Sequence, residues 1–224
     1  MTSAVEVSDV DVVRDGRLVL QGFSCRVAPG ELVAIMGPNG VGKSTLVDVL
    51  LGLCEVSAGS VRVFGQPPPA ALVGFVPQAA AQSLLPWLSV ADNVTLPLRL
   101  RHVAPIDRDK ALRALYERAD PDCRLDLRAR LAVLSAGEKQ FVAWLRALIA
   151  LPRLLVIDEA FSALDEQRRL HLRALLRDHD VLPENAAVVL VTHDPLEAAE
   201  LAQRRIVLEG RPARASQESI CRTA

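Results

Sequence analysis

The sequence predicts an α/β fold with a mostly parallel core sheet, an antiparallel β-subdomain at its N-terminus and an inserted helical subdomain. Three observations predict it. Up to about residue 76 the chain reads as short strands separated by turns. From about 79 to 150 these give way to periodic apolar stretches, and after Pro152 strands again alternate with helices. Strands that alternate with helices are typical of a parallel sheet covered on both faces.

These changes of pattern divide a single expected domain, residues 1–224. We expect a core at about 1–78 and 152–210, a helical subdomain at about 79–151 and a short C-terminal tail at 211–224. A chain of this length is long enough to bury a sizeable core.

The N-terminal third is expected to be mainly β. Residues 5–13 and 18–27 alternate apolar and polar side chains, and Asp15-Gly16 between them is typical of a hairpin turn. The other elements expected here are a buried strand at 31–36, a helix at 43–53 and strands at 61–64 and 72–76.

Capping residues mark the helices of the inserted subdomain. The pair at 92–93 could open one helix, and Asp107 has the position of the N-cap of a second that runs to Ala119. Ser135 has the position of the N-cap of a long helix through Leu151, which the following proline stops.

The remaining chain is expected to complete the core sheet. Residues 154–158 read as a buried strand that ends in an acid, and an Arg-rich amphipathic helix follows. A strand at 186–191, a short helix from Pro195 and a last strand at 205–208 complete the pattern.

Composition and charge exclude several classes of protein. Half of the residues are apolar, and 27 acids against 26 bases leave a net charge of −1, which gives no overall attraction to nucleic acid or to an anionic membrane. The first residues lack the features of a secretory signal, and no apolar run approaches the roughly 20 residues that span a bilayer. The four cysteines are scattered without a CxxC pair, which favours reduced thiols over a zinc site or a disulfide framework.

A glycine-rich motif predicts a nucleotide site. Residues 37–45, GPNGVGKST, fit the pattern G-x-x-x-x-G-K-[ST] of P-loop NTPases and lie between a buried strand and a helix. The glycines let backbone N–H groups face a phosphate chain, Lys43 would reach the β- and γ-phosphates, and the hydroxyl of Ser44 would bind Mg²⁺. The expected phosphate-binding residues are Gly37, Pro38, Asn39, Gly40, Val41, Gly42, Lys43, Ser44 and Thr45.

Two adjacent acids follow the apolar run that begins at Leu154. In P-loop proteins an Asp at the tip of such a strand holds Mg²⁺, so we expect Asp158 to be a metal residue. Because side chains alternate along a strand, that of Glu159 would point the other way, free to act as a general base toward an attacking water. The alternative is a solvated strand end, where acids are common.

Five further segments carry a family resemblance. They are VGFVPQ at 73–78, LSAGEKQ at 134–140, the strand with the two acids at 154–159, SALD at 162–165 and VTHD at 191–194. With the phosphate loop, they resemble the ATPase subunit of an ATP-binding cassette (ABC) transporter over nearly the whole chain. The segment LSAGEKQ, here called the signature segment, is similar to the family signature LSGGQ. It is the discriminating feature, because GTPases and P-loop kinases have no counterpart to it.

The resemblance implies ATP and Mg²⁺ as ligands and assigns roles to single residues. Gln78 would contact Mg²⁺ and the attacking water, and His193 would contact the γ-phosphate. Ser135 and the N–H of Gly137 would bind the γ-phosphate of the ATP held by a second protomer, with Asp165 in the adjoining D-loop. Taken singly, each has a plainer explanation, as a loop glutamine, a structural histidine or a helix cap. Their order and spacing along the chain make the case.

Several positions depart from the family pattern. No aromatic residue ends the first expected strand to stack on adenine, and only Arg14 offers a cation for that role. In the signature segment Ala136 replaces a glycine and Glu138 replaces a glutamine, which puts a carboxylate near phosphates. Phe141 stands where a basic residue is usual in the family, and Ala160 stands where a proline is usual. None of these changes removes a phosphate ligand or the base, so hydrolysis is still expected.

The implied function is that of an ATP-hydrolysing subunit that dimerises head to tail around ATP and powers solute transport through separate membrane permease subunits. The second ATP-binding subunit would be another copy, or a different chain in a heterodimer. The subunit would be cytoplasmic, peripheral on the cytoplasmic face of the cell membrane, with no nucleic-acid partner. The stretch 83–94 resembles small-molecule importer subunits, notably those for sulfonates and nitrate, although its Leu85 and Trp87 could equally pack a core.

Two alternatives stay open at this point. One is a degenerate cassette with weak or no hydrolysis that supports an active partner, which the altered signature segment favours. The other is a soluble ABC ATPase that acts on DNA or ribosomes. No long coiled-coil insertion or second cassette supports it, and nine Arg or Lys against six acids at 99–130 are typical of a solvated face.

Overall fold

The chain folds into two units in this computed structural model, which describes residues 3–68, 73–122 and 124–220. Unit 1 draws on the segments Met1–Val73, Arg153–Glu159 and Glu184–Ala224, and unit 2 on Gly74–Pro152 and Ala160–Pro183. Each unit is therefore assembled from pieces of the chain that are distant in sequence.

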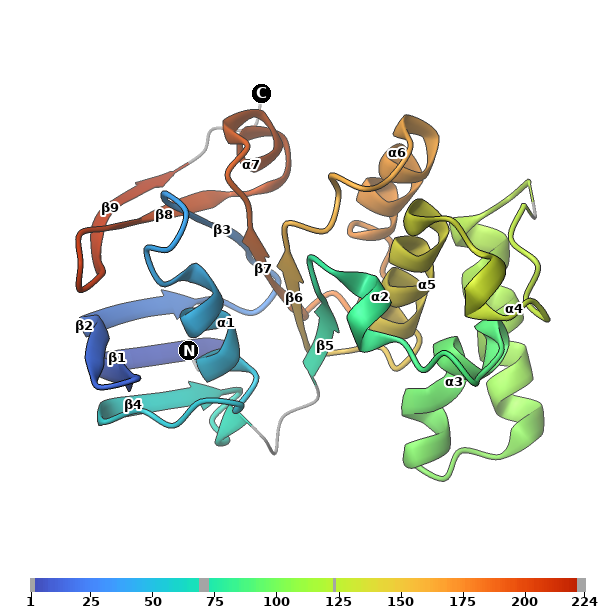
Figure 1. The fold of residues 1–224 in the computed structure, drawn as a ribbon, viewed down its shortest axis with the longest axis horizontal. Helices are drawn as coiled ribbons and strands as arrows, with labels where there is room; N and C mark the ends of the chain where they lie inside the picture. The colour runs from blue at the N-terminus through green and yellow to red at the C-terminus, as the bar shows by residue number, and fades with distance from the viewer. Residues whose placement is uncertain (1–2, 69–72, 123, 221–224) are drawn as a thin grey trace. The chain divides into compact units, whose positions relative to one another are not determined.

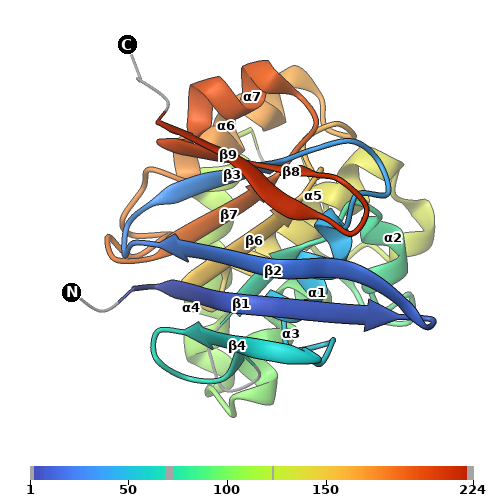
Figure 2. The ribbon, with the colours of Figure 1, turned by 90° about the vertical axis from the view of Figure 1, so that its left-hand side faces the viewer.

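Unit 1 contains two sheets (Figures 1 and 2). The smaller sheet is antiparallel, with the order β2-β1-β4, and the larger has the order β6-β7-β3-β8-β9 within this unit. Its strands are parallel except β9, which runs antiparallel to β8. The strands are β1 (Val5–Arg14), β2 (Arg17–Val27), β3 (Leu32–Met36), β4 (Ala58–Val63), β6 (Leu154–Asp158), β7 (Ala187–Val191), β8 (Arg204–Glu209) and β9 (Arg214–Ile220).

The burial of the central strands of the larger sheet explains why their sequences are continuous apolar runs. β7 is buried at every residue, and β3 and β6 are buried at all but their last. Continuous apolar strands are typical of parallel sheets that are covered on both faces. Helix α1 (Lys43–Leu50) contacts both sheets, through β2 and β4 on one side and β6 on the other. Helix α7 (Pro195–Leu201) connects β7 to β8.

Unit 2 is mainly helical. Strand β5 (Val73–Val76) leads into it, and its other elements are α2 (Ala80–Ser83), α3 (Val90–Leu100), α4 (Pro105–Ala119), a 3₁₀ turn at Leu131–Val133, α5 (Ala136–Leu148) and α6 (Glu166–Leu175). Its core includes the fully buried Trp144, whose ring centroid lies 4.7 Å from that of Phe161. Together the units confirm the predicted α/β fold with an N-terminal antiparallel sheet and helices inserted between strands.

Two predicted helix starts are wrong by two or three residues. Helix α3 begins at Val90, before the predicted pair at 92–93, because Ser89 is the N-cap and its hydroxyl accepts a hydrogen bond from Asp92 N. Helix α4 begins at Pro105, so Asp107 lies in the first turn instead of at the N-cap. Proline suits the first helical position because the N–H that it lacks has no partner there.

Two predicted helix ends are also wrong. Helix α1 ends at Leu50, not at residue 53, because Gly52 takes a positive φ of 72° and Leu53 is exposed. Helix α5 ends at Leu148 in place of Leu151, which has a positive φ of 49°. In both cases the helix stops where the backbone turns left-handed.

The predicted C-terminal tail contains a strand. Residues 214–220 form β9 and pair with β8, so 205–208 is not the last strand. The turn before β9 is also attached to the smaller sheet, since Ala213 N donates to Val19 O at 2.8 Å and Gln21 N donates to Ala213 O at 3.1 Å. The segment after Gly210 is thus part of unit 1.

Candidate nucleotide-binding site

The phosphate loop joins β3 to α1 in unit 1, and two of its glycines are needed for close packing. Gly37 has a φ of 148°, and a Cβ there would lie 2.6 Å from Leu208 O. Gly42 has a φ of 119°, and a Cβ there would lie 3.1 Å from Leu20 Cδ2. Residues with side chains rarely take these angles. The glycine spacing of the motif therefore allows the loop to lie directly against β2 and β8.

The start of α1 is open to an anion. Gly42 is its N-cap, no side chain caps it, and its first turn carries no acid. The first N–H groups of a helix lack partners within the helix, and the helix dipole adds positive character there. Ser44, in the same turn, is exposed. This arrangement fits the phosphates of a nucleotide, which would supply the missing acceptors.

The ammonium of Lys43 lies inside the loop. The residue is buried, and its Nζ donates to Gly37 O at 2.8 Å and to Pro38 O at 3.2 Å. The same Nζ lies 3.9 Å from Oε1 of Glu159. The lysine of the motif is therefore held between the loop and an acid at the tip of β6.

Contacts with Lys43, His193 and the backbone of β7 help to hold Glu159. Its backbone N donates to Val191 O at 2.9 Å, one carboxylate oxygen faces Lys43, and the other lies 3.2 Å from His193 Nδ1. Its φ is 48°, in the left-handed region that few residues with side chains occupy. β6 has already ended at Asp158, so strand alternation, the expected reason for separating the two acids, does not apply. The turn at Glu159 aims its side chain instead.

The carboxyl of Asp158 is harder to ionise than that of an ordinary aspartate. Burial is the main cause that raises its pKa to about 6, the charges of Glu159 and Asp48 contribute to the same rise, and Lys43 opposes it. A nearby cation would stabilise the ionised carboxylate. Mg²⁺ prefers oxygen ligands, which the carboxylate of Asp158 and the exposed hydroxyl of Ser44 both offer. The donor set of unit 1 thus fits a magnesium ion.

The sequence motifs did not show where two arginines of unit 1 lie. Arg14, the expected cation for adenine stacking, pairs with Asp48 of α1, with Nη2 2.5 Å from Oδ2. Arg211, in the segment predicted as a tail, places Nη2 3.6 Å from where a Cβ of Gly40 would lie. Arg211 was missed because no motif covers the β8–β9 turn.

The remaining predicted site residues belong to unit 2. Gln78 follows β5 and is exposed, and Ser135 and Asp165 are the N-caps of α5 and α6. A Cβ on Gly137 would lie 3.0 Å from Ala163 O, so this glycine also allows the SALD segment to approach α5. The structure thus groups the phosphate loop, Asp158, Glu159 and His193 in unit 1, and Gln78, Ser135, Gly137 and Asp165 in unit 2.

One residue of the signature segment was overlooked. The side chain of Gln140 is buried, and its Nε2 donates to Pro77 O at 2.9 Å, next to Gln78. This bond ties α5 to the start of the loop that carries Gln78. The sequence signal was present, because the buried polar side chain falls among the apolar residues of an amphipathic helix.

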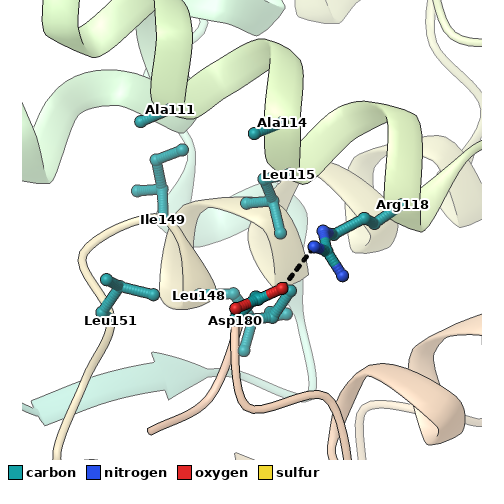
Figure 3. A pocket seen from close by; sticks show the side chains of 9 residues that line it. Ala111, Ala114, Leu115, Arg118, Leu148, Ile149, Leu151 and Asp180 are labelled. Carbon is teal, nitrogen blue, oxygen red and sulfur yellow. Dashed lines mark hydrogen bonds and ion pairs between the residues drawn. The ribbon is translucent and has the colours of Figure 1, made fainter.

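Unit 2 also contains an apolar cavity of about 210 Å³. Figure 3 shows apolar side chains of α4 and of the end of α5 around it, with the ion pair between Arg118 and Asp180 at its edge. The lining residues are Ala111, Ala114, Leu115, Arg118, Leu148, Ile149, Leu151, Asp180 and Val181. Its charged groups already neutralise each other, so it lacks the convergent polar groups of a nucleotide site.

Comparisons with known proteins agree on one family. A family model described as ABC transporter matches residues 20–162. The chain is 42% identical over 206 residues to the aliphatic sulfonates import ATP-binding protein SsuB 2 of Frankia alni, over 92% of this chain and 77% of that protein. It is 34% identical over 214 residues to the Nod factor export ATP-binding protein I of Rhizobium etli, over 93% and 66%.

A solved structure gives the same result. The chain superposes with a TM-score of 0.83 and 26% identity on a dimeric structure of the ATP-binding cassette MJ0796 in a post-hydrolysis state, bound to ADP and Pi, over 98% of this chain and 100% of that one. Among the residues that the structure describes, none of the helices combines the length and the apolar character needed to cross a membrane.

Proposed function

This chain belongs to the ABC transporter family, whose ATP-binding subunits are ATPases, and we propose that it powers solute transport as half of an ATP-bridged dimer. One observation carries the proposal. The carboxylate of Glu159 is held between Lys43 and His193, in the same unit as the uncapped start of α1. A base, a phosphate cradle and a cation are therefore already assembled, which supports active hydrolysis over a degenerate cassette.

Each residue of this group has a distinct task in hydrolysis. Lys43 and the first N–H groups of α1 bind the phosphates. Ser44 and Asp158 would hold Mg²⁺, which when bound neutralises charge on the phosphates. Glu159 accepts the proton of the attacking water, and general bases of this kind contribute about 10²- to 10⁴-fold to a rate. His193 orients that carboxylate and can donate to the γ-phosphate from its exposed side.

The active form requires a second copy of the chain. Ser135, the N–H of Gly137 and Asp165 would complete the site of the partner, and the partner's signature segment would complete this one. The dimeric cassette bound to ADP and Pi, which this chain resembles along its full length, supports that arrangement. A γ-phosphate that bridges both subunits binds the closed state better than the open one, so it can drive closure.

The membrane partner is proposed to be a separate permease, which would place the chain on the cytoplasmic face of the cell membrane. The relative in Frankia alni is named for the import of aliphatic sulfonates, so these are the first solutes to test. In the importer-like stretch Trp87 is 66% exposed and Leu85 is half-buried, which favours a docking role for Trp87 over core packing. The amide of Asn93 fixes this stretch by two hydrogen bonds to the backbone of Leu85.

The transport proposal is tested by uptake. Cells that lack the chain should take up a radiolabelled aliphatic sulfonate more slowly, and the wild-type chain should restore uptake. The Glu159→Gln chain, expressed at the same level, should not. Unchanged uptake in the cells without the chain would exclude sulfonates as its solute.

A further inference from the structure

The two helix N-termini that are proposed to meet phosphates differ in one respect. That of α1 has no side-chain cap, whereas that of α5 is closed by its own residues. Both the backbone N and the Oγ of Ser135 donate to Oε2 of Glu138 at 2.8 Å, and Glu138 N donates back to the serine Oγ at 3.2 Å. The hydroxyl hydrogen that would face a phosphate is therefore already bound to a carboxylate.

Glu138 is ionised at neutral pH. Hydrogen bonds from the backbone and the side chain of Ser135 lower the pKa of its carboxyl, and the charge of Arg168 lowers it further. An anion at a helix N-terminus is favourable, but a second anion at the same place is repelled. A phosphate that approaches Ser135 must therefore displace Glu138 or share the site with it.

Arg168 lies close to this carboxylate and has unused hydrogen-bonding capacity. It is 8% exposed, and its side chain donates no hydrogen bond within the described part of the chain, with Nε fully buried. Its nearest charged group is Asp165, with Nε 3.8 Å from Oδ2. A buried donor without an acceptor costs free energy, so a carboxylate that moved to Arg168 would be stabilised.

Phe141 fixes where this guanidinium lies. Arg168 Cζ is 5.0 Å from the centre of the Phe141 ring, within the range of a cation–π interaction. Phe141 follows Glu138 by three positions on α5, and residues spaced by three share one face of a helix. Phe141, which stands where a basic residue is usual, therefore holds the guanidinium of Arg168 from α6. It does so on the face of α5 that carries Glu138.

We propose that Glu138 competes with the partner's γ-phosphate for Ser135, and that Arg168 is the positioning residue that receives the Glu138 carboxylate when the phosphate binds. The exchange replaces two hydrogen bonds from Ser135 to Glu138 with bonds from Ser135 to phosphate and an ion pair between Glu138 and Arg168. This inference rests on the proposed function of the signature segment in a dimer. The competition between Glu138 and the phosphate makes ATP-driven closure of the dimer weaker than in a chain without the Glu138 carboxylate.

The test is the dissociation constant of the dimer, measured by sedimentation with saturating ATP and Mg²⁺ on the full chain carrying Glu159→Gln. Adding Glu138→Gln should tighten the dimer about tenfold, because an opposing charge leaves a helix N-terminus. The matched control is Glu166→Gln, an exposed acid in the first turn of α6, which should leave the constant unchanged. An unchanged or weaker dimer with Glu138→Gln overturns the competition.

The role of Arg168 is tested in the same assay by making each Arg168 variant in two chains, one with Glu138 and one with Glu138→Gln. Arg168→Met should weaken the dimer about fivefold when Glu138 is present and have little effect alongside Glu138→Gln, since coupled residues are not additive. Arg168→Lys should restore most of the loss, and it carries the test if the methionine variant does not fold. Equal losses in both backgrounds would contradict the exchange. If the parent chain itself does not dimerise with ATP, the proposed function fails instead.

Discussion

His193 Nδ1 lies 3.2 Å from Oε2 of Glu159, and the two side chains differ sharply in exposure. The carboxylate side chain is 13% exposed, whereas the imidazole is 65% exposed. The acid is thus enclosed, while the histidine is open to solvent. This pair joins the ends of β6 and β7, which are adjacent strands of the larger sheet.

Glu159→Gln tests the general base. The amide keeps the size of the side chain but accepts a proton far less readily, so hydrolysis should fall at least about 100-fold. Binding of ATP should persist, because Lys43 and the start of α1 are unchanged. The measurements are phosphate release and the binding of a fluorescent ATP analogue. A wild-type rate of release in this variant would assign the base elsewhere.

Lys43→Ala tests the phosphate loop. The change removes the buried cation that lies between the loop and Glu159, so nucleotide affinity should fall by about tenfold or more. The control is Lys110→Ala, which removes an exposed lysine from α4. Calorimetric titration with ATP should show weak binding for the first variant and wild-type binding for the second. Equal affinities would place the phosphates away from the loop.

Asp158→Asn tests the raised pKa of Asp158 through the pH dependence of thermal stability. The pKa of Asp158 is raised from 3.8 to about 6, so between these values the folded chain holds a proton that the unfolded chain has lost. The stability from the protonated acid is therefore present below about pH 4 and is lost as the pH rises through about 6. Without nucleotide, the asparagine variant should melt above the wild type at pH 7, with a gain that shrinks toward pH 4. A gain independent of pH would contradict the assignment.

Ser135 variants test whether this residue stabilises α5 as its N-cap. Ser135→Ala removes the cap and should lower the free energy of unfolding by about 1 kcal/mol. Ser135→Thr should retain most of it, because threonine keeps a hydroxyl that can accept from Glu138 N and donate to the Glu138 carboxylate. Urea denaturation measures both changes. Equal losses in the two variants would show that the serine does not stabilise the helix as a cap.

The fold was largely predictable where one signal dominates. The apolar runs of β3, β6 and β7 and the cap at Ser135 predicted elements that the structure confirms. Strand β9 was not predictable, because it pairs at the edge of the sheet through backbone hydrogen bonds and its sequence has no apolar alternation.

The candidate site was predictable in composition but not in geometry. The motifs named Lys43 and both acids, but no residue type predicts the left-handed backbone at Glu159 that aims its carboxylate. The pairing of Arg14 with Asp48 joins residues 34 positions apart, which no local pattern reports. Contacts of this kind arise only when distant segments pack together.

The central claim, that each site takes its phosphate loop from one chain and its signature segment from another, is tested most directly by mixing two inactive variants. Lys43→Ala lacks the cation of the phosphate loop, and Ser135→Asp has an added negative charge at the signature segment, so each alone should release little phosphate from ATP. A mixed dimer contains one intact site, so an equimolar mixture should recover about a quarter of the wild-type rate if dimers form at random and the sites act independently. A mixture no more active than the average of its two components would contradict the shared site.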